Sequence, residues 1–196
     1  MNRKPPPRMT VADFLAWDGP GKFELVDGDL RAMAPASATH GVIQARLSQL
    51  LGQHLAAASS ICRVVAEPAI AVRIRSNVNT RIPDLGVTCA PIRAGDVLLP
   101  SPILLIEIQS PNNAADTWDN VWAYTTIPTV REIVIVHSTR LLAEVLQRDA
   151  DGNWAANPTE IGPDEVLTLA SVDYAVPLKD AYAGTYLLEP GADAGG

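Results

Sequence analysis

The chain has 196 residues, a length that suits one well-buried core and is short for two. Apolar residues make up 47% and charged residues 19%, which excludes a disordered composition. The formal net charge of −7 argues against a surface that coats DNA broadly. Five arginines could still form a local basic strip, although a solvated strand face is an equally good interpretation; they are Arg63, Arg73, Arg75, Arg81 and Arg93.

Two features indicate the cellular compartment. The basic, proline-rich N-terminus is followed by no apolar signal core, and no apolar run is long enough to span a membrane. Cys62 and Cys89 lie in apolar, strand-like segments, and we prefer two buried, reduced thiols to a disulfide or a metal pair. We therefore expect a soluble, cytoplasmic protein without a membrane partner.

The sequence predicts a flexible lead over 1–9, a single domain over 10–188 and a flexible tail over 189–196. Local sequence patterns predict the helices and strands of the domain. Thr10 with Asp13 three residues later predicts a short capped helix. Asp27-Gly28 predicts a tight turn between strands at 23–26 and 29–33. Apolar residues at helical spacing predict the main helix over 38–57.

In the remaining segments, apolar residues recur either with the two-residue period of strands or with the 3.6-residue period of helices. Strands are expected at 62–66, 69–75, 84–89, 102–109, 131–137, 141–148 and 153–160, and helices at 115–125 and near 178–186. A helix, then a meander, then a strand–helix–strand crossover indicates an α/β or α+β domain with one mixed sheet.

Glu107 is the most informative residue, because its segment 103–109 reads as a strand covered on both faces. An ionised carboxylate there is unfavourable unless it is paired, hydrogen-bonded or bound to a cation. Gln109 lies two residues further and shares its face. The alternative is that the strand end reaches solvent and Glu107 pairs with an arginine.

Asp84 follows Pro83 at the start of another apolar strand, where a lone aspartate would more often cap a turn. Together with Glu107, it would form an all-oxygen site on adjacent strands that suits Mg²⁺ or Mn²⁺. Such an ion can polarise a phosphoryl oxygen and activate water.

Two further polar residues are candidates for this site. Glu24 lies on the hairpin opposite Arg31, so a plain cross-strand ion pair is the alternative. His40 falls in the first turn of the main helix and could accept a proton or orient water, or only cap the helix.

The ordered set of these residues resembles the Uma-two family of restriction-endonuclease-fold proteins. It comprises the segment 23–30 (FELVDGDL), His40, Pro83-Asp84-Leu85, the segment 106–111 (IEIQSP) and Tyr124. The resemblance implies a central mixed β-sheet flanked by helices. It also implies a divalent-metal-dependent DNA endonuclease that hydrolyses phosphodiester bonds, with Asp84 and Glu107 as Mg²⁺ or Mn²⁺ ligands. The family's matching glutamate and histidine are Glu24 and His40, and a homodimer would suit cleavage of both strands.

The departure from the family concerns a lysine. The two positions at which the resemblance implies it hold Gln109 and Asn120, and no lysine lies between Lys22 and Lys179. Gln109 is a candidate catalytic residue, because it can position a water through a hydrogen bond, but it carries no charge. A single charged donor in such sites contributes much of the rate. We therefore expect weak cleavage, faster with Mn²⁺ than with Mg²⁺, that a lysine at 109 or 120 would raise. The alternative is a catalytically silent binding or interaction module with the same fold.

Overall fold

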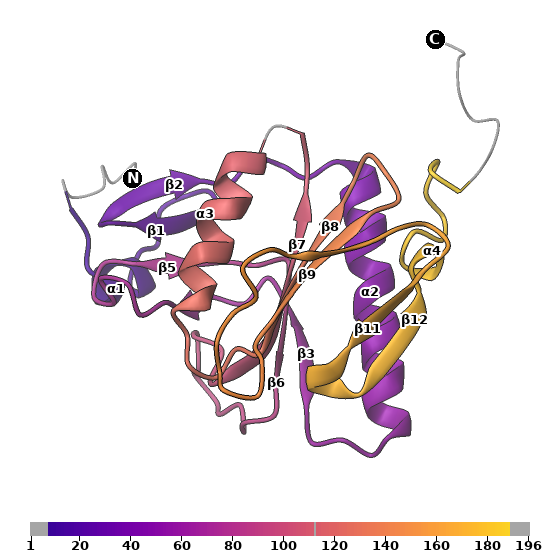
Figure 1. Cartoon of the computed structure of the whole chain (residues 1–196). Helices are drawn as coiled ribbons and strands as arrows, with labels where there is room; N and C mark the ends of the chain where they lie inside the picture. Colours follow the sequence, from indigo (N-terminus) through magenta and orange to yellow (C-terminus); the bar gives the residue numbers. More distant parts are fainter. Residues whose placement is uncertain (1–7, 112, 189–196) are drawn as a thin grey trace, which may run out of the picture.

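The computed structural model describes residues 8–111 and 113–188 and is built on a central six-stranded sheet with the order β10-β9-β8-β7-β6-β3 (Figure 1). Its strands are β3 (Arg63–Ala66), β6 (Leu85–Thr88), β7 (Pro102–Gln109), β8 (Glu132–His137), β9 (Ala143–Gln147) and β10 (Thr159–Ile161). Neighbours are antiparallel except β7 and β8, which are parallel and joined through helix α3 (Ala114–Thr125). The fold is therefore the expected mixed sheet with flanking helices.

A smaller four-stranded sheet, with the order β2-β1-β5-β4, lies beside α3 (Figure 1). It contains β1 (Phe23–Val26), β2 (Asp29–Ala32), β4 (Ile70–Ala71) and β5 (Thr80–Arg81). The hairpin β1–β2 turns at Asp27 and Gly28, which have φ of 50° and 89°. Both values are positive, as a tight primed turn requires.

Helix α1 (Val11–Leu15) precedes this hairpin and begins at the predicted residue. The Thr10 side chain accepts from the Asp13 backbone N–H, and the Asp13 carboxylate accepts from the Thr10 N–H, so the capping box is complete. Met9 falls inside the expected lead, but it is buried and its N–H donates to the Gly28 carbonyl at 2.8 Å. The rest of the expected flexible ends, 1–7 and 189–196, lies outside the described residues.

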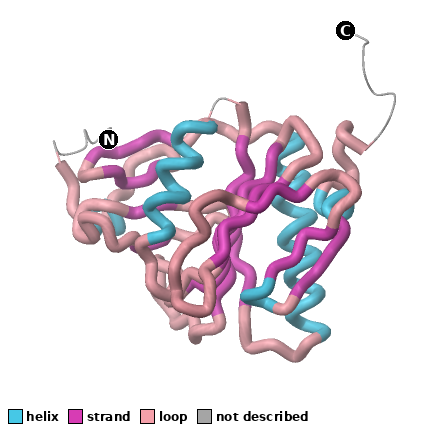
Figure 2. Tube along the Cα trace, in the orientation of Figure 1, coloured by secondary structure: helices cyan, strands magenta, loops and turns pink. Residues whose placement is uncertain are grey.

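Two helices cover the two faces of the central sheet (Figure 2). Helix α2 (Ala38–Ala57) packs Ile43, Leu47, Leu51 and Leu55 against one face, where α4 (Leu178–Ala181) and the strands β11 (Val166–Leu169) and β12 (Tyr174–Pro177) complete the core. Helix α3 packs Val121 and Tyr124 against the opposite face. Because β7 contributes side chains to both cores, it is covered on both faces as predicted.

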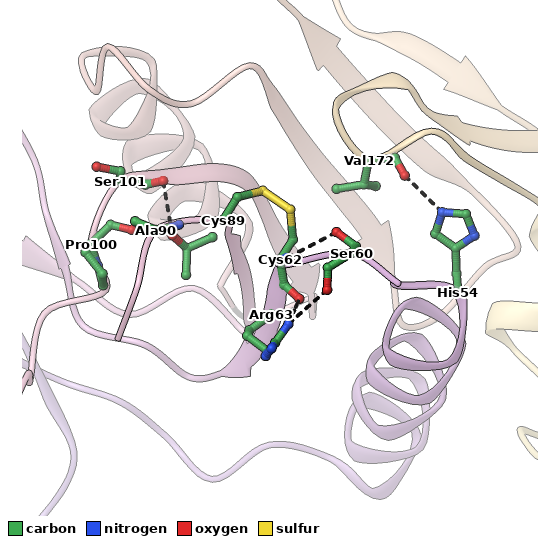
Figure 3. Close-up of a disulfide and its surroundings, with 10 residues drawn as sticks. His54, Ser60, Cys62, Arg63, Cys89, Ala90, Pro100, Ser101 and Val172 are labelled. Atoms are coloured by element: carbon green, nitrogen blue, oxygen red, sulfur yellow. Dashed lines mark hydrogen bonds between the residues drawn. A yellow bond between two sulfur atoms is a disulfide. The ribbon is translucent and has the colours of Figure 1, made fainter. Parts of the chain in front are cut away.

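The prediction of free thiols is wrong. Cys62 and Cys89 form a disulfide that joins the start of β3 to the end of β6 (Figure 3). Arg63 pairs with Thr88 in the antiparallel register, so Cys62 and Cys89 follow as the next cross-strand pair. Both cysteines are half-buried. The apolar setting of each cysteine was visible in the sequence, but the register that brings them together is a tertiary property.

Two strand predictions are also corrected, and three strands were missed. The segment 69–75 is strand only at Ile70–Ala71, and 153–160 is strand only from Thr159. Strands β5, β11 and β12 were not expected from the sequence. These segments are short, and short strands carry too few side chains to show a period.

Within the residues that the structure describes, no helix is both long and apolar enough to cross a membrane.

Candidate metal site in the cleft

A cleft of about 1060 Å³ opens where the small sheet, the first turn of α2, the end of β7 and the start of α3 meet. Its walls include four of the five residues proposed from the sequence, namely Glu24, His40, Asp84 and Glu107. The fifth, Gln109, is the last residue of β7, is half-buried and is not among the residues that line the cleft. In the sheet it lies opposite His137.

Strand register brings Asp84 beside Glu107. Leu85 pairs with Ile106 in the antiparallel ladder of β6 and β7, so the next step of the register sets Asp84 opposite Glu107. The backbone N–H of Ile108 donates to Asp84 Oδ2 at 2.6 Å. The two carboxylates therefore lie on adjacent strands at one end of the sheet.

Asp84 is held from the α2 side by His40. Nε2 of His40 lies 2.8 Å from Asp84 Oδ1, and the Gln44 side chain donates to the Asp84 carbonyl at 2.9 Å. Ser37 caps α2 by accepting the His40 backbone N–H, which sets the imidazole at the start of the helix.

The remaining ring nitrogen of His40 indicates its tautomer. Nδ1 is buried and has no hydrogen-bond partner among the described residues. A buried donor without an acceptor is more unfavourable than a buried lone pair, so the proton belongs on Nε2, pointing at Asp84. Nδ1 is therefore closed off from the cleft, and Nε2 is directed at Asp84.

Glu107 is 7% exposed, and one of its oxygens is fixed by two donors. Tyr124 donates its hydroxyl to Oε1 at 2.6 Å, and Asn120 Nδ2 donates to the same oxygen at 3.3 Å. Oε2 makes no hydrogen bond among the described residues, and Glu107 is one of the residues that line the cleft. Glu107 therefore does not pair with an arginine, which was the alternative considered from the sequence.

The surroundings disfavour the negative charge of Glu107. Burial raises its pKa well above the usual range, and the nearby carboxylates of Asp84 and Glu24 raise it further. The hydrogen bonds from Tyr124 and Asn120 act in the opposite direction. Burial raises the pKa of Tyr124, and the carboxylates of Glu107, Glu24 and Asp84 raise it further, so Tyr124 stays a neutral donor.

Glu24 forms the cross-strand ion pair that was the simpler sequence alternative, but it also belongs to the cleft. It is 3% exposed and pairs with Arg31 across the hairpin. Its other oxygen, Oε1, accepts from the Ile82 backbone N–H at 2.8 Å and from Asn120 Nδ2 at 3.1 Å.

Sequence reasoning missed the extent of this network. Arg31 reaches beyond Glu24 to Asp116 and Asn120 on α3. Burial alone would lower the pKa of Arg31, but the charge and hydrogen bond of Glu24 together with the charges of Asp116 and Asp119 raise it overall, so the guanidinium stays charged. In the sequence, Asn120 was noted only because it occupies a position where the family has a lysine. No sequence pattern indicated that Asp116 belongs to this network.

The donor set suits a hard divalent cation that keeps much of its own hydration. Among the described residues, no group of three or more His, Cys, Asp or Glu side chains could enclose an ion. Mg²⁺ does not need such a cage, because it usually binds through one or two carboxylates and completes its shell with water and substrate phosphate. Asp84 and Oε2 of Glu107 meet that requirement, and a cation would compensate the charge that burial disfavours.

A mixed sheet with two carboxylates at one strand end, inside a cleft, defines a restriction-endonuclease-like class of protein. The model of the Uma2 family, described as "Putative restriction endonuclease", matches residues 11–176, and the chain belongs to this family. An uncharacterized protein of Synechocystis sp. is 29% identical over 154 residues, which cover 76% of this chain and 80% of that protein.

A solved structure supports the fold. A crystal structure from Anabaena variabilis, described as "a putative nuclease belonging to DUF820", superposes with a TM-score of 0.72 at 16% sequence identity. The match covers 89% of this chain and 98% of the other. Similarity at this level of identity shows the fold, and the nuclease-like character of the chain comes from its family.

Proposed function

We propose that this protein is a metal-dependent endonuclease that hydrolyses phosphodiester bonds in DNA. The observation that carries the proposal is the pair Asp84 and Glu107, which lie opposite each other in the wall of the cleft, with Glu107 Oε2 free of hydrogen bonds among the described residues. Both carboxylates are held by protein donors on their other sides, so their positions are fixed before a ligand arrives.

Each residue has a separate role in the proposal. Asp84 and Glu107 would hold Mg²⁺ or Mn²⁺, His40 orients Asp84, and Tyr124 orients Glu107. When bound, the cation polarises a phosphoryl oxygen and lowers the pKa of water. Glu24 is not assigned as a metal ligand, because its negative charge is already compensated by the ion pair with Arg31.

Weak cleavage, faster with Mn²⁺ than with Mg²⁺, is the expected behaviour. Lys22 is the single lysine among the described residues of the cleft wall, and it pairs with Glu67 at 2.6 Å. Without a lysine near Glu107, stabilisation of the phosphate relies largely on the metal, and Mn²⁺ is the better Lewis acid. Gln109 lies outside the cleft wall, so a direct role for it is not part of the proposal.

The test combines metal binding with cleavage. Mn²⁺ titration calorimetry should show binding to wild type that is lost in Asp84→Asn and kept in the control Asp164→Asn, whose exposed carboxylate pairs with Lys179. Plasmid nicking should require Mn²⁺ or Mg²⁺, stop in EDTA and disappear in Asp84→Asn. Nicking that persists in Asp84→Asn, or in EDTA, would disprove the mechanism.

A silent binding module is the second candidate, and one observation favours it. Both oxygens of Asp84 already accept hydrogen bonds from the protein, so the carboxylate is satisfied without a metal. This candidate predicts an intact fold with no measurable Mn²⁺ binding. Calorimetry on wild type therefore separates the two functions before any cleavage assay.

Compartment and assembly are further parts of the proposal. The cytoplasmic location expected from the sequence conflicts with the Cys62–Cys89 disulfide, because disulfides are rare in reducing compartments. A homodimer would supply a second cleft for the second DNA strand. Light scattering after size exclusion would test this, and a monomer would limit the enzyme to nicking.

A further inference from the structure

Two cationic side chains line the described part of the cleft wall, and their settings differ. Lys22 pairs with Glu67, and both side chains are largely exposed, at 40% and 46%. Arg31 is only 21% exposed and lies deeper. Its Nε donates to Glu24 Oε2 at 3.0 Å, its Nη1 to Asp116 Oδ1 at 3.0 Å, and its Nη2 to Asn120 Oδ1.

A third cation lies close to Glu24 but is turned away from the cleft. Arg81 on β5 is buried, and its Nη1 donates to the Leu25 carbonyl at 2.7 Å and to Asn79 Oδ1 at 3.1 Å. It does not line the cleft. Arg31 is therefore the cation that joins the carboxylates of the small sheet to helix α3.

Asn120 connects Arg31 to both buried glutamates. Its Oδ1 accepts from Arg31, while its Nδ2 donates to Glu24 Oε1 at 3.1 Å and to Glu107 Oε1 at 3.3 Å. The opposite amide orientation would set Nδ2 against a guanidinium and Oδ1 against two carboxylates, so the network determines the assignment. A guanidinium on the amide oxygen polarises the amide and strengthens the donor that faces Glu107.

We propose that Arg31, acting through the Asn120 carboxamide, supplies the positive charge that serves the carboxylates of this cleft in place of a lysine. The inference rests on the proposed nuclease function. Arg31 makes no contact with Asp84 or Glu107 in the described network, so it is a positioning residue, and Asn120 carries its effect to Glu107.

The positive charge of Arg31 should affect metal affinity and the rate of cleavage in opposite directions. A fixed positive charge held one amide away from Glu107 opposes the binding of a divalent cation, but it favours the negative charge that develops on a phosphate during hydrolysis. A residue that only maintained the shape of the site would weaken both when it is replaced. The two roles can therefore be distinguished.

The experiment compares Arg31→Gln, Asn120→Lys, their double variant and the control Lys22→Gln. Mn²⁺ affinity is measured by calorimetry without DNA, plasmid nicking is measured at saturating Mn²⁺, and thermal melts confirm folding. Lys22→Gln removes an equal charge from the same cleft, yet its pair with Glu67 is exposed and makes no contact with this network. It should leave both readouts unchanged.

Arg31→Gln should bind Mn²⁺ more tightly than wild type and nick roughly 10- to 100-fold more slowly, the range for partners behind metal ligands. Asn120→Lys alone should bind Mn²⁺ more weakly and gain no cleavage, because its ammonium would lie against Arg31. In the double variant that ammonium replaces the lost charge, so nicking should recover. This changes the expectation from sequence: lysine at 120 helps only when Arg31 is absent.

Several outcomes would overturn the inference. They are nicking by Arg31→Gln at the wild-type rate, Mn²⁺ affinity that is unchanged or lower in this variant, no recovery in the double variant, and a loss of nicking in Lys22→Gln alone.

If wild type binds Mn²⁺ but never nicks, the nuclease proposal fails by itself. The opposite affinity changes in Arg31→Gln and Asn120→Lys then still decide the role of Arg31. Should Arg31→Gln fail to fold, Asn120→Lys provides the same affinity test, and wild type that binds no Mn²⁺ overturns both proposals.

Discussion

Glu107 shows how a single side chain can be unfavourable for the fold and suited to a ligand. It is buried among apolar neighbours on β7, and two further carboxylates lie close to it. Its two hydrogen bonds satisfy one oxygen and leave the other without a partner among the described residues. Residues held in such unfavourable electrostatic settings concentrate at functional sites, because a ligand of opposite charge relieves them.

A Glu107→Gln variant should therefore melt at a higher temperature than wild type at pH 7 in EDTA. The pKa of Glu107 is raised in the folded state, above about 4.3 in the unfolded state, so the folded protein binds more protons between these two values. The free energy of unfolding then falls as pH rises through that window. Glutamine keeps an oxygen for Tyr124 and carries no charge to bury.

Calorimetric melts from pH 3.5 to pH 8 would test this. The advantage of Glu107→Gln should vanish at the acidic end, where Glu107 is protonated in both states. Glu67→Gln is the control, since its pair with Lys22 is exposed and contributes little. A lower melting temperature for Glu107→Gln at pH 7 would mean that the fold stabilises the ionised carboxylate.

Among the elements, strand β6 holds the site together because it carries Asp84 at one end and the disulfide at the other. It is buried along its whole length and pairs with β3 and β7. Gly86 lies at its centre, where an added Cβ would meet Leu99 Cδ2 at 2.8 Å and Pro68 Cγ at 3.0 Å. The strand therefore has little room for a side chain on that face.

We expect Gly86→Val to destabilise the protein by about 1–3 kcal/mol, because Leu99 and Pro68 must move to admit the branched side chain. Urea unfolding would measure this change. Gly52→Val is not a matched control, because Gly52 lies in a helix. Gly95→Ala is the better control, because Gly95 lies in an exposed loop and an added Cβ would meet no atom within 4 Å, although its φ of 87° adds strain of its own. Unchanged stability in Gly86→Val would show that this side of β6 is loosely packed.

Reduction of the Cys62–Cys89 bond should lower stability by roughly 3–4 kcal/mol, as the chain-entropy model gives for a closed loop of this size. The two cysteines are 27 residues apart in sequence, and the loop between them contains β3, β4, β5 and β6. Melts with and without dithiothreitol, on wild type and on Cys62→Ser/Cys89→Ser, would measure the effect. Dithiothreitol should not change the melting temperature of the double variant. If it also leaves the melting temperature of wild type unchanged, the disulfide is absent in solution.

For the whole molecule, charge limits how DNA can be bound. The net charge is −7, and the cleft wall contains more carboxylates than cations. The local basic strip is smaller than the sequence allowed, because Arg81 is buried and Arg75 pairs with Asp27. Arg63, Arg73 and Arg93 remain exposed.

DNA binding in EDTA should therefore depend only weakly on salt. Because the two cations of the cleft wall are both paired with carboxylates, few positive charges are free for phosphate, and the slope of log K against log salt should be no steeper than roughly −2. Fluorescence anisotropy of a labelled duplex between 50 and 200 mM salt would measure it, and added Mn²⁺ should tighten binding in wild type but not in Asp84→Asn. A slope near −5 would reveal a basic surface beyond the cleft.

The sequence alone determined the features that arise from local patterns. The main helix was predicted over 38–57 and is α2, the covered strand over 102–109 is β7, and the Thr10–Asp13 capping box is complete. Each depends on a period or a cap that neighbouring residues express by themselves. The strand end with Asp84 and the helix start with His40 followed from the same local signals.

Tertiary structure alone decided which distant residues meet. The disulfide depends on the register of β3 against β6, and Gln109 stays outside the cleft although it shares a strand with Glu107. Arg31 and Asn120 are separated by 89 residues and meet because the small sheet packs beside α3. No local period records such a contact, since it arises only after loops have closed and two layers have packed, and the charge balance of the cleft depends on it.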